Sequence, residues 1–354
     1  MYKVIKVTES EYEDFLTLPV DIYEKKDLMQ KRSDEEQLLK GTHTLSRYFS
    51  FTAFVCYLDG KPVSRCAITI YNDKNEAYLG FFDSENDREA VKALMNAAEE
   101  YACSQGIIKL TGPVDASFWI GYRMKNDCFD EHRYFSEPYG VSYYPELWKE
   151  NGYEVSGTYI SNIYKKVDKS EADDEKYKKR YDFLMKKGYR IVSAEKKNWD
   201  VIIGEVYHLI MELYSDFPVF SYITEEEFRE MYKDLKSVLD FSMVKLGYKN
   251  DKLVGFLICV PDYGNRLYGN IGISDILFLL KNRFRSDNYV LLYMGVDGNH
   301  LGLGSAISQV IFKELCRKKA SSVGALIKKG KVTEKYIDSK VLKKREYVLF
   351  EKEL

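Results

Sequence analysis

A glycine-rich stretch, Met294-Gly295-Val296-Asp297-Gly298-Asn299-His300-Leu301-Gly302-Leu303-Gly304-Ser305, lies between two apolar segments. Residues 289–293 before it form a continuous apolar run, which predicts a buried strand. Residues 306–317 after it carry apolar side chains at helical spacing. A turn of this kind directs several backbone N–H groups and the positive end of the helix dipole toward one point. The sequence therefore predicts a site for phosphate oxygens at this turn.

The composition limits the classes of partner. The chain has 354 residues, enough for two domains, and its 53 basic and 55 acidic residues give a formal net charge of -2. Nucleic acid or an anionic membrane would favour a basic excess, so neither is expected as a partner. Six cysteines stand singly without any CxxC pair, so we expect neither a zinc site nor disulfides.

The N-terminus and the apolar runs give an expectation for the compartment. Residues 1–7 alternate like a strand rather than reading as a signal peptide. The longest apolar runs, such as 253–260, are far too short to cross a bilayer. We therefore expect a cytoplasmic protein with reduced thiols and no metal.

The order of predicted elements occurs twice. The first half predicts a strand at 2–7, helices at 12–19 and 21–39, a hairpin of 51–58 with 63–71, a strand at 75–82, a helix at 88–104 and a strand at 107–110. The second half predicts a strand at 189–192, helices at 201–214 and 225–239, a hairpin of 241–249 with 253–258, an extra helix at 275–281, a strand at 289–293, a helix at 306–317 and a strand at 323–327.

The two hairpins also match in detail. Tyr57, Asp59, Lys61 and Val63, shifted by a constant 191 positions, fall on Tyr248, Asn250, Lys252 and Val254. The sequence therefore predicts one α/β unit used twice. Because residues 165–179 are dense in charge, we place the boundary there, with domains at 1–168 and 169–354. The same run is also compatible with a solvated helix face within one continuous body.

This order of elements resembles the GNAT (GCN5-related N-acetyltransferase) superfamily, whose fourth strand leads into a Q/R-x-x-G-x-G/A loop. Here the loop reads Asn299-His300-Leu301-Gly302-Leu303-Gly304, with asparagine where the family usually has Gln or Arg. The resemblance implies an α/β (α+β) fold of two GNAT-like domains in tandem, each a mixed, mostly antiparallel sheet flanked by helices. It also implies acetyl-CoA as co-substrate. Asn299, His300, Leu301, Gly302, Leu303, Gly304 and Ser305 would hold its pyrophosphate, and Met294, Gly295 and Val296 would hold the pantetheine arm and thioester.

The resemblance also implies a catalytic tyrosine in the helix after the next strand. Tyr336, in a predicted helix at 332–339, stands at about that place and would protonate the departing thiolate. A tyrosine packed in the core is the alternative interpretation. Several acidic or histidine residues are candidate general bases, and none is assigned: His208, Glu212, Asp216, Asp262 and His300.

The N-terminal copy departs from this pattern at the equivalent loop. Residues 83–87 contain three carboxylates and no glycine, and the carboxylates would repel a pyrophosphate. They are typical of helix caps instead. We therefore expect a degenerate GNAT-like domain that does not bind CoA in the usual way.

A distinctive segment closes the N-terminal copy. Residues 111–123, 137–145 and 147–153 resemble a group of bacterial tandem-GNAT proteins in the order of their "GP", "EPY…YY" and "GY" motifs. The segment mixes aromatic and charged residues as a substrate pocket would, so the candidate substrate residues are Trp119, Tyr122, Arg123 and Glu137. A packed loop without a ligand is the alternative.

The expected function is an acyl-CoA-dependent N-acyltransferase, most simply an N-acetyltransferase. A small-molecule or peptide amine would attack the thioester directly, without a metal. A non-catalytic acyl-CoA- or protein-binding module is the alternative, and oligomerisation is left open. A tRNA-dependent aminoacyl transferase is a third interpretation, disfavoured by the balanced charge although 281–285 is locally basic.

Overall fold

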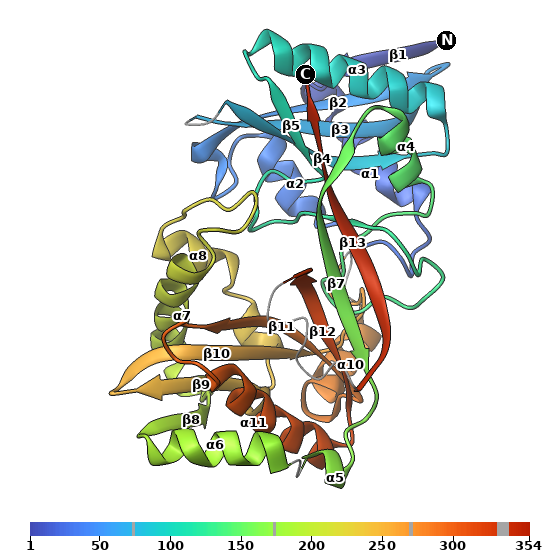
Figure 1. The fold of residues 1–354 in the computed structure, drawn as a ribbon. Coiled ribbons are helices and arrows are strands. Elements are labelled where there is room, and N and C mark those ends of the chain that lie inside the picture. The colour runs from blue at the N-terminus through green and yellow to red at the C-terminus, as the bar shows by residue number, and fades with distance from the viewer. Residues whose placement is uncertain (73–74, 173–174, 269–271, 331–339) are drawn as a thin grey trace. The chain divides into compact units, whose positions relative to one another are not determined.

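The computed structural model describes residues 1–72, 75–172, 175–268, 272–330 and 340–354. The chain divides into two compact units (Figure 1). The first unit comprises Met1–Tyr159, Asn265–Asn270 and Glu346–Leu354, and the second comprises Ile160–Gly264 and Ile271–Arg345. Each unit has its own buried apolar cluster.

The first unit contains a mixed sheet in the order β1-β2-β3-β4-β5-β13-β7, with β6 also paired to β13. The pairs from β1 to β4 are antiparallel, and β4 and β5 run parallel. Helix α3 covers one face of this sheet and α1 the other (Figure 1). The elements are β1 Tyr2–Lys6, α1 Tyr12–Ile22, α2 Arg32–Leu39, β2 Phe49–Leu58, β3 Lys61–Tyr71, β4 Glu76–Ser84, α3 Arg88–Ser104, β5 Lys109–Gly112, β6 Met124–Lys125, α4 Tyr144–Glu150, β7 Glu154–Tyr164 and β13 Val341–Glu353.

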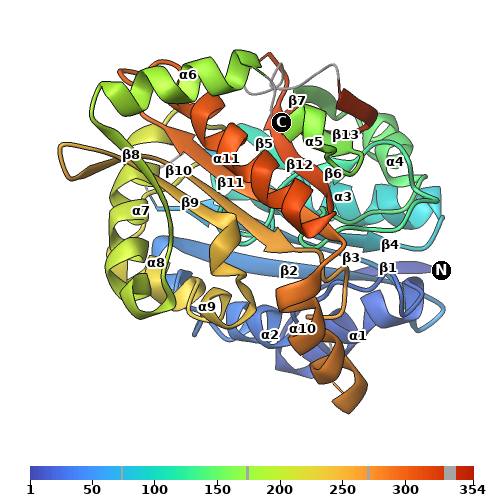
Figure 2. The same ribbon diagram turned by 90° about the horizontal axis from the view of Figure 1, so that it is seen from below.

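The second unit contains a sheet in the order β7-β12-β11-β10-β9-β8. Strands β11 and β12 are parallel, and the pairs from β8 to β11 are antiparallel. Helices α6 and α11 lie side by side on one face, and α7 lies on the other (Figures 1 and 2). The elements are α5 Lys169–Ala172, α6 Glu175–Lys186, β8 Tyr189–Ser193, α7 Trp199–Leu213, α8 Glu225–Met231, α9 Leu235–Val238, β9 Val244–Lys249, β10 Lys252–Pro261, α10 Ile273–Arg285, β11 Asn288–Val296, α11 Leu303–Lys318 and β12 Ser321–Lys328. Short 3-10 helices lie at Glu9–Glu11, Ser46–Tyr48, Lys196–Asn198 and Phe241–Met243.

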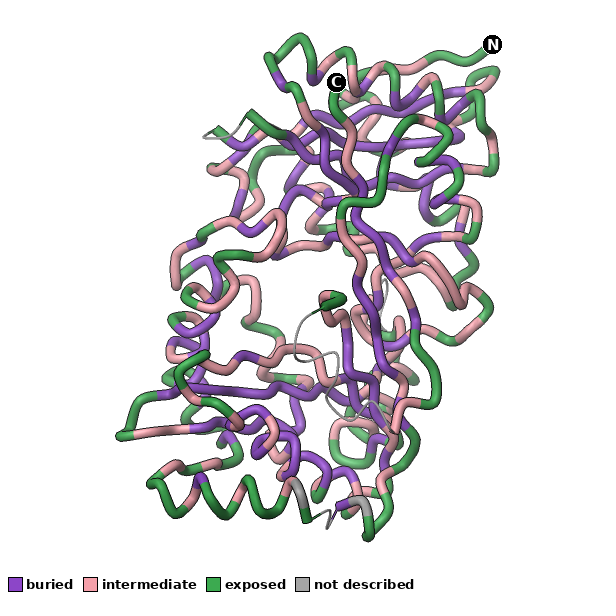
Figure 3. Tube along the Cα trace, in the orientation of Figure 1, coloured by how far each residue is buried: buried purple, intermediate pink, exposed green. Residues whose placement is uncertain are grey.

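The central strands are buried on both faces. Figure 3 shows β10 almost entirely, and β2 and β3 mostly, in the buried colour. Helices cover both faces of the sheet, so β10 reads as a nearly continuous apolar run, whereas β3 also buries Ser64, Arg65 and Thr69. This accounts for the apolar stretches that predicted them.

The last strand of the chain belongs partly to the first unit. Phe350 pairs with Gly112 and Glu353 with Lys109, so the C-terminal part of β13 extends the sheet of the first unit beyond β5. The partner residues are more than 200 positions apart in the sequence, so no local pattern predicts this pairing.

Pro19 lies inside α1, which corrects the prediction that the helix ends there. A proline in a helix removes the N–H that would bond to the carbonyl four residues earlier. That carbonyl belongs to Phe15, and it accepts a hydrogen bond from Nη1 of Arg65 at 2.8 Å instead. Arg65 therefore satisfies the group that Pro19 would leave unpaired.

Three other predicted helices have different bounds. Of the helix expected at 21–39, residues 21–22 belong to α1 and residues 32–39 form α2, and the backbone of Tyr23 between them is extended. The helix expected at 225–239 is divided into α8 and α9. The helix expected at 275–281 is longer, as α10, and it has no buried residue.

The repeat extends beyond the hairpins to a side-chain contact. The hydroxyl of Tyr57 donates to Oδ2 of Asp14 at 2.6 Å, and that of Tyr248 donates to Oε2 of Glu205 at 2.7 Å. The phenols and the carboxylates occupy equivalent places in the two copies. The tyrosine lies on β2 in the first copy and on β9 in the second, and the carboxylate lies on α1 and α7 respectively. Each contact joins the hairpin to the long helix that follows β1 in the first unit and β8 in the second.

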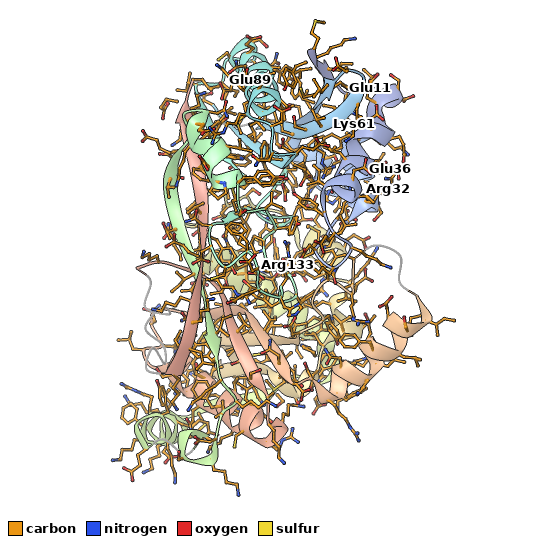
Figure 4. All side chains as sticks on the ribbon, turned by 90° about the vertical axis from the view of Figure 1, so that its right-hand side faces the viewer. Glu11, Arg32, Glu36, Lys61, Glu89 and Arg133 are labelled. Atoms are coloured by element: carbon orange, nitrogen blue, oxygen red, sulfur yellow. The ribbon has the colours of Figure 1, made fainter. Side chains whose placement is uncertain are left out.

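Several charges on the surface of the first unit form ion pairs. Figure 4 labels Arg32, Glu36 and Lys61 there. Arg32 pairs with Glu13 at 2.6 Å, and Lys61 pairs with Glu85 at 2.7 Å. Such exposed pairs contribute little to stability individually. In the described part of the chain, no helix has the length and hydropathy needed to cross a membrane.

We expect the replacements Tyr57→Phe and Tyr248→Phe to lower the free energy of unfolding by about 1 kcal/mol each. Each replacement leaves a carboxylate without its donor and does not alter the apolar ring. Urea denaturation of the two variants tests this, with Tyr222→Phe as the control because Tyr222 is 64% exposed. Equal stabilities for all three variants would contradict a structural role for the repeated contact.

Candidate functional site

Strands β11 and β12 separate part-way along their length. Their parallel pairing runs from Asn288 with Ser321 to Leu291 with Gly324, yet β11 continues to Val296 and β12 to Lys328. A bulge accompanies the separation, because Tyr293 pairs with Ile258 and Leu291 with Cys259, which leaves Leu292 as the extra residue. The strands therefore form a V beside the start of α11.

The loop that follows β11 is organised by Asp297. Its Oδ1 accepts from the backbone N–H of Asn299 at 2.9 Å and from Nδ2 of the same residue at 3.0 Å. The carbonyl of Asp297 accepts from the N–H of His300 at 2.9 Å. These bonds turn the chain through Gly302, whose φ of 87° lies in the left-handed region that glycine tolerates best.

The first turn of α11 has backbone donors available for a ligand. Gly302 is the N-cap and makes no side-chain cap. Among the described residues, the N–H groups of Leu301, Gly302, Gly304 and Ser305 have no hydrogen-bond acceptor. Because these unpaired N–H groups lie at or next to the positive end of a helix dipole, the site is suited to an anion.

The first unit has the same separation of strands, but its own chain fills the space. Strands β4 and β5 pair only from Glu76 with Lys109 to Tyr78 with Thr111, and β4 continues to Ser84. The N–H of Val114 donates to the carbonyl of Leu79 at 2.9 Å. Next to it, Oδ1 of Asp115 accepts from the N–H of Phe81 at 2.7 Å.

Packing leaves no space between this segment and β4. A Cβ on Gly80 would lie 1.9 Å from the carbonyl oxygen of Val114. Phe81 has a φ of 48°, and the carboxylate of Asp115 holds its N–H in that conformation. In the first unit, the chain itself therefore occupies the place between the separated strands.

The helix that follows β4 is capped by a carboxylate. Oδ1 of Asp87 accepts from the N–H of Ala90 at 3.0 Å, as the sequence predicted for this loop. Asp83 is not a cap, since β4 extends through it and its carboxylate binds Arg65 at 2.7 Å. Glu85 likewise pairs with Lys61. The first unit thus places negative charge where the second unit has glycine.

Two solved structures share this architecture over the full length of the chain. A tandem GNAT protein from the clavulanic acid biosynthesis pathway is 11% identical, with a TM-score of 0.52, over 100% of this chain and 98% of that one. A conserved protein of unknown function from Enterococcus faecalis V583, described as a probable N-acyltransferase, is 10% identical with a TM-score of 0.51, over 100% of this chain and 73% of that one. The chain has the tandem GNAT fold. No protein-family model and no curated protein matches the sequence.

The predicted fold class is confirmed, and within the tandem GNAT fold the predicted loop joins β11 to α11. Leu301 is exposed, whereas Leu303 and Gly304 are buried in the start of α11. Nδ1 of His300 is 2.8 Å from the hydroxyl of Tyr189, so this ring is held beside the loop. Ser305 is partly exposed at the third helical position.

The strand residues predicted to contact the thioester lie just beyond the bulge. The carbonyl of Met294 accepts from the hydroxyl of Tyr214 at 3.0 Å, and Val296 is partly exposed. A Cβ on Gly295 would lie 2.6 Å from the ring of Phe256, so this glycine permits close packing against β10.

The predicted proton donor, Tyr336, lies outside the described residues. Of the candidate bases, Asp262 is engaged in hydrogen bonds: its Oδ1 accepts from the N–H of Gly264 at 2.9 Å, and its Oδ2 accepts from Nδ2 of Asn288 on β11 at 2.9 Å. Glu212 and Asp216 are located near the end of α7, and His208 is exposed on the same helix. The described residues contain no cluster of histidine, cysteine and acidic side chains suited to a metal.

An aromatic group beside β11 was not identified from the sequence. The rings of Tyr232 and Tyr293 are 6.0 Å apart, and those of Tyr214 and Phe217 are 4.9 Å apart. Removal from water raises the pKa of Tyr232 well above its usual value, so its phenol stays protonated. The only signal in the sequence was the large number of tyrosines, which does not place any of them.

The candidate substrate residues of the first unit divide into two groups. The guanidinium of Arg123 lies 3.8 Å from the ring centroid of Tyr122, and Trp119 is buried nearby in the chain. Glu137 is instead a buried partner of Lys125, with Oε1 accepting from Nζ at 3.0 Å. The same oxygen accepts from the hydroxyl of Tyr347 at 2.7 Å. Glu137 therefore joins β6 to β13.

We expect Asp115→Asn to flatten the pH dependence of stability between about pH 4 and 7. Removal from water raises the pKa of this carboxyl from 3.8 to about 7, so the folded state binds a proton that the unfolded state releases. Stability is therefore lost as the pH rises through this window, by at most about 4 kcal/mol.

Chemical denaturation of the wild type and variant at several pH values measures this slope. The introduced asparagine keeps an oxygen for the N–H of Phe81 and carries no charge, so the variant should gain stability relative to the wild type at pH 8. Asp21→Asn is the control, because Asp21 is exposed. A wild-type slope retained in Asp115→Asn would refute the assignment of this titration.

Proposed function

We propose that this chain is an acyl-CoA-dependent N-acyltransferase, most simply an N-acetyltransferase, and that its second unit binds the acyl-CoA. The observation that carries the proposal is the combination of a V between β11 and β12 with unpaired donors at the first turn of α11. An acyl-CoA needs both features, because its pantetheine arm is extended and its pyrophosphate is anionic. The tandem GNAT fold supports this assignment by analogy.

The reaction requires no covalent enzyme intermediate. The lone pair of the acceptor amine attacks the thioester carbonyl, the C–S bond breaks, and the amine nitrogen loses one proton while the departing thiolate gains one. Tyr336 is the residue that we propose for protonating the thiolate. The acceptor is a small-molecule or peptide amine that would approach along the aromatic group formed by Tyr214, Phe217, Tyr232 and Tyr293.

The first unit would have a different task. Its equivalent V holds Val114 and Asp115, and its equivalent helix is capped by Asp87. A second acyl-CoA in the same pose would have to displace a bonded chain segment and face a carboxylate. We therefore assign one acyl-CoA to the whole chain, and a role in shaping the acceptor site or an interface to the first unit.

We expect Ser305→Glu to weaken acetyl-CoA binding at least ten-fold, about 1.4 kcal/mol. Ser305 stands at the third position of α11, where a glutamate is compatible with the helix dipole but would repel a pyrophosphate. Ser305→Gln is the matched control, since it has the same size without the charge. Calorimetric titration of the three proteins with acetyl-CoA gives the dissociation constants and the stoichiometry.

Three outcomes separate the candidate functions. Binding at one site per chain that Ser305→Glu weakens and Ser305→Gln largely preserves supports the proposed location. Subsequent release of CoA with a panel of amines distinguishes an enzyme from a non-catalytic acyl-CoA-binding module. A wild type that binds no acetyl-CoA would overturn the proposal and favour a protein-binding module.

A further inference from the structure

The phosphate loop has no permanent positive charge of its own. Residues 297–305 contain no lysine or arginine. Asp297 contributes a negative charge, and its carboxylate lies 3.7 Å from Nε2 of His300. Backbone N–H groups alone would therefore have to offset both a pyrophosphate and a nearby carboxylate. Another part of the chain would have to supply a cation.

An arginine from a distant segment lies against this loop. Arg180 is on α6, whose residues Tyr177, Tyr181 and Leu184 pack into the apolar core of the second unit. This packing fixes the helix beside α11, and both views show the two helices side by side (Figures 1 and 2). The side chain of Arg180 therefore projects from a supported helix.

The contact between Arg180 and the loop is direct. A Cβ built on Gly302 would lie 2.8 Å from Cδ, 3.0 Å from Nε and 3.2 Å from Cζ of Arg180. The side chain of Arg180 thus lies against Gly302, the N-cap residue of α11. Within the described residues, no acceptor or carboxylate binds the guanidinium, and the side chain is exposed. Its donors are free to meet a ligand.

We propose that Arg180 binds the pyrophosphate of the acyl-CoA together with the backbone donors of the loop. This inference rests on the proposed function. A guanidinium can donate two parallel hydrogen bonds to a phosphate, and it keeps its charge at every physiological pH. The backbone donors and Arg180 converge from different elements, α11 and α6, so the phosphate would be held between them.

The proposal gives Gly302 a second role. The left-handed backbone alone could be adopted by asparagine at a moderate cost. A side chain of any kind at this position would displace the guanidinium, because the nearest atoms are within 3.2 Å of the Cβ. We therefore expect substitutions at Gly302 to impair the arginine as well as the turn.

The test compares two ligands that differ in the pyrophosphate. Acetyl-CoA contains it, whereas acetyl-pantetheine retains the thioester and pantetheine arm without it. Calorimetric titration of the wild type and Arg180→Ala should show about a ten- to hundred-fold weaker affinity of the variant for acetyl-CoA. Acetyl-pantetheine should bind both proteins with the same affinity, and Arg180→Lys should be intermediate for acetyl-CoA.

A matched control lies one residue away. Lys179 is on the same helix and pairs with Glu175 at 3.0 Å, so Lys179→Ala removes one positive charge without touching the loop. We expect this control to leave both affinities unchanged. Thermal unfolding of all four proteins shows whether α6 is retained.

Each outcome supports or overturns the inference. If the wild type binds acetyl-CoA and Arg180→Ala binds it equally well, Arg180 has no such role and the proposed function survives. If Arg180→Ala loses both ligands equally, or if Lys179→Ala weakens acetyl-CoA as much, the effect is structural or non-specific and the assignment fails. If the wild type binds no acetyl-CoA, the proposed function fails and this inference fails with it.

Discussion

Two parallel strands that stop pairing inside a sheet leave backbone donors and acceptors without partners. Such groups are costly if they remain unsatisfied and buried, so something must bind them. In the first unit the partner is the chain itself: the N–H of Val114 donates to the carbonyl of Leu79, and the carboxylate of Asp115 accepts from the N–H of Phe81. In the second unit Tyr214 binds the carbonyl of Met294, and a pantetheine arm would complete the rest under the proposed function. The backbone groups left by the separated strands are thus satisfied by the chain itself in the first unit and, under the proposed function, partly by a ligand in the second.

The two copies also differ in the sign of the charge at one helix end. Asp87 caps α3 with a carboxylate, whereas Gly302 leaves the first turn of α11 without a side-chain cap. The hairpins, their two-residue turns and the contacts of Tyr57 and Tyr248 are retained in both copies. Under the proposed function, a few residues around the V therefore determine whether a unit binds an anionic cofactor, while the scaffold stays the same.

Local patterns in the sequence predicted what depends on local physics. The hairpins, the glycine-rich turn between β11 and α11 and the cap at Asp87 follow from apolar periodicity, glycine and short-range hydrogen bonds. The end of α1 was predicted too early, at Pro19. The helix continues because Arg65, 46 residues away in the sequence, supplies the hydrogen bond to the carbonyl of Phe15 that Pro19 cannot donate. The pairing of β13 with β5 and the insertion of Asp115 beside Phe81 are also non-local. Tyr336 remains a prediction.

The environment of Gly302 shows why a motif alone describes the site incompletely. A glycine in a phosphate loop is ordinarily explained by its backbone freedom and by close approach of the ligand. Here its φ of 87° agrees with the first explanation, but the atoms nearest to its missing side chain belong to Arg180. That arginine lies more than 100 positions earlier, next to a charge-dense run that the sequence indicated only as a boundary. The loop and the cation that faces it are therefore one structural feature, and only the fold brings its two parts together.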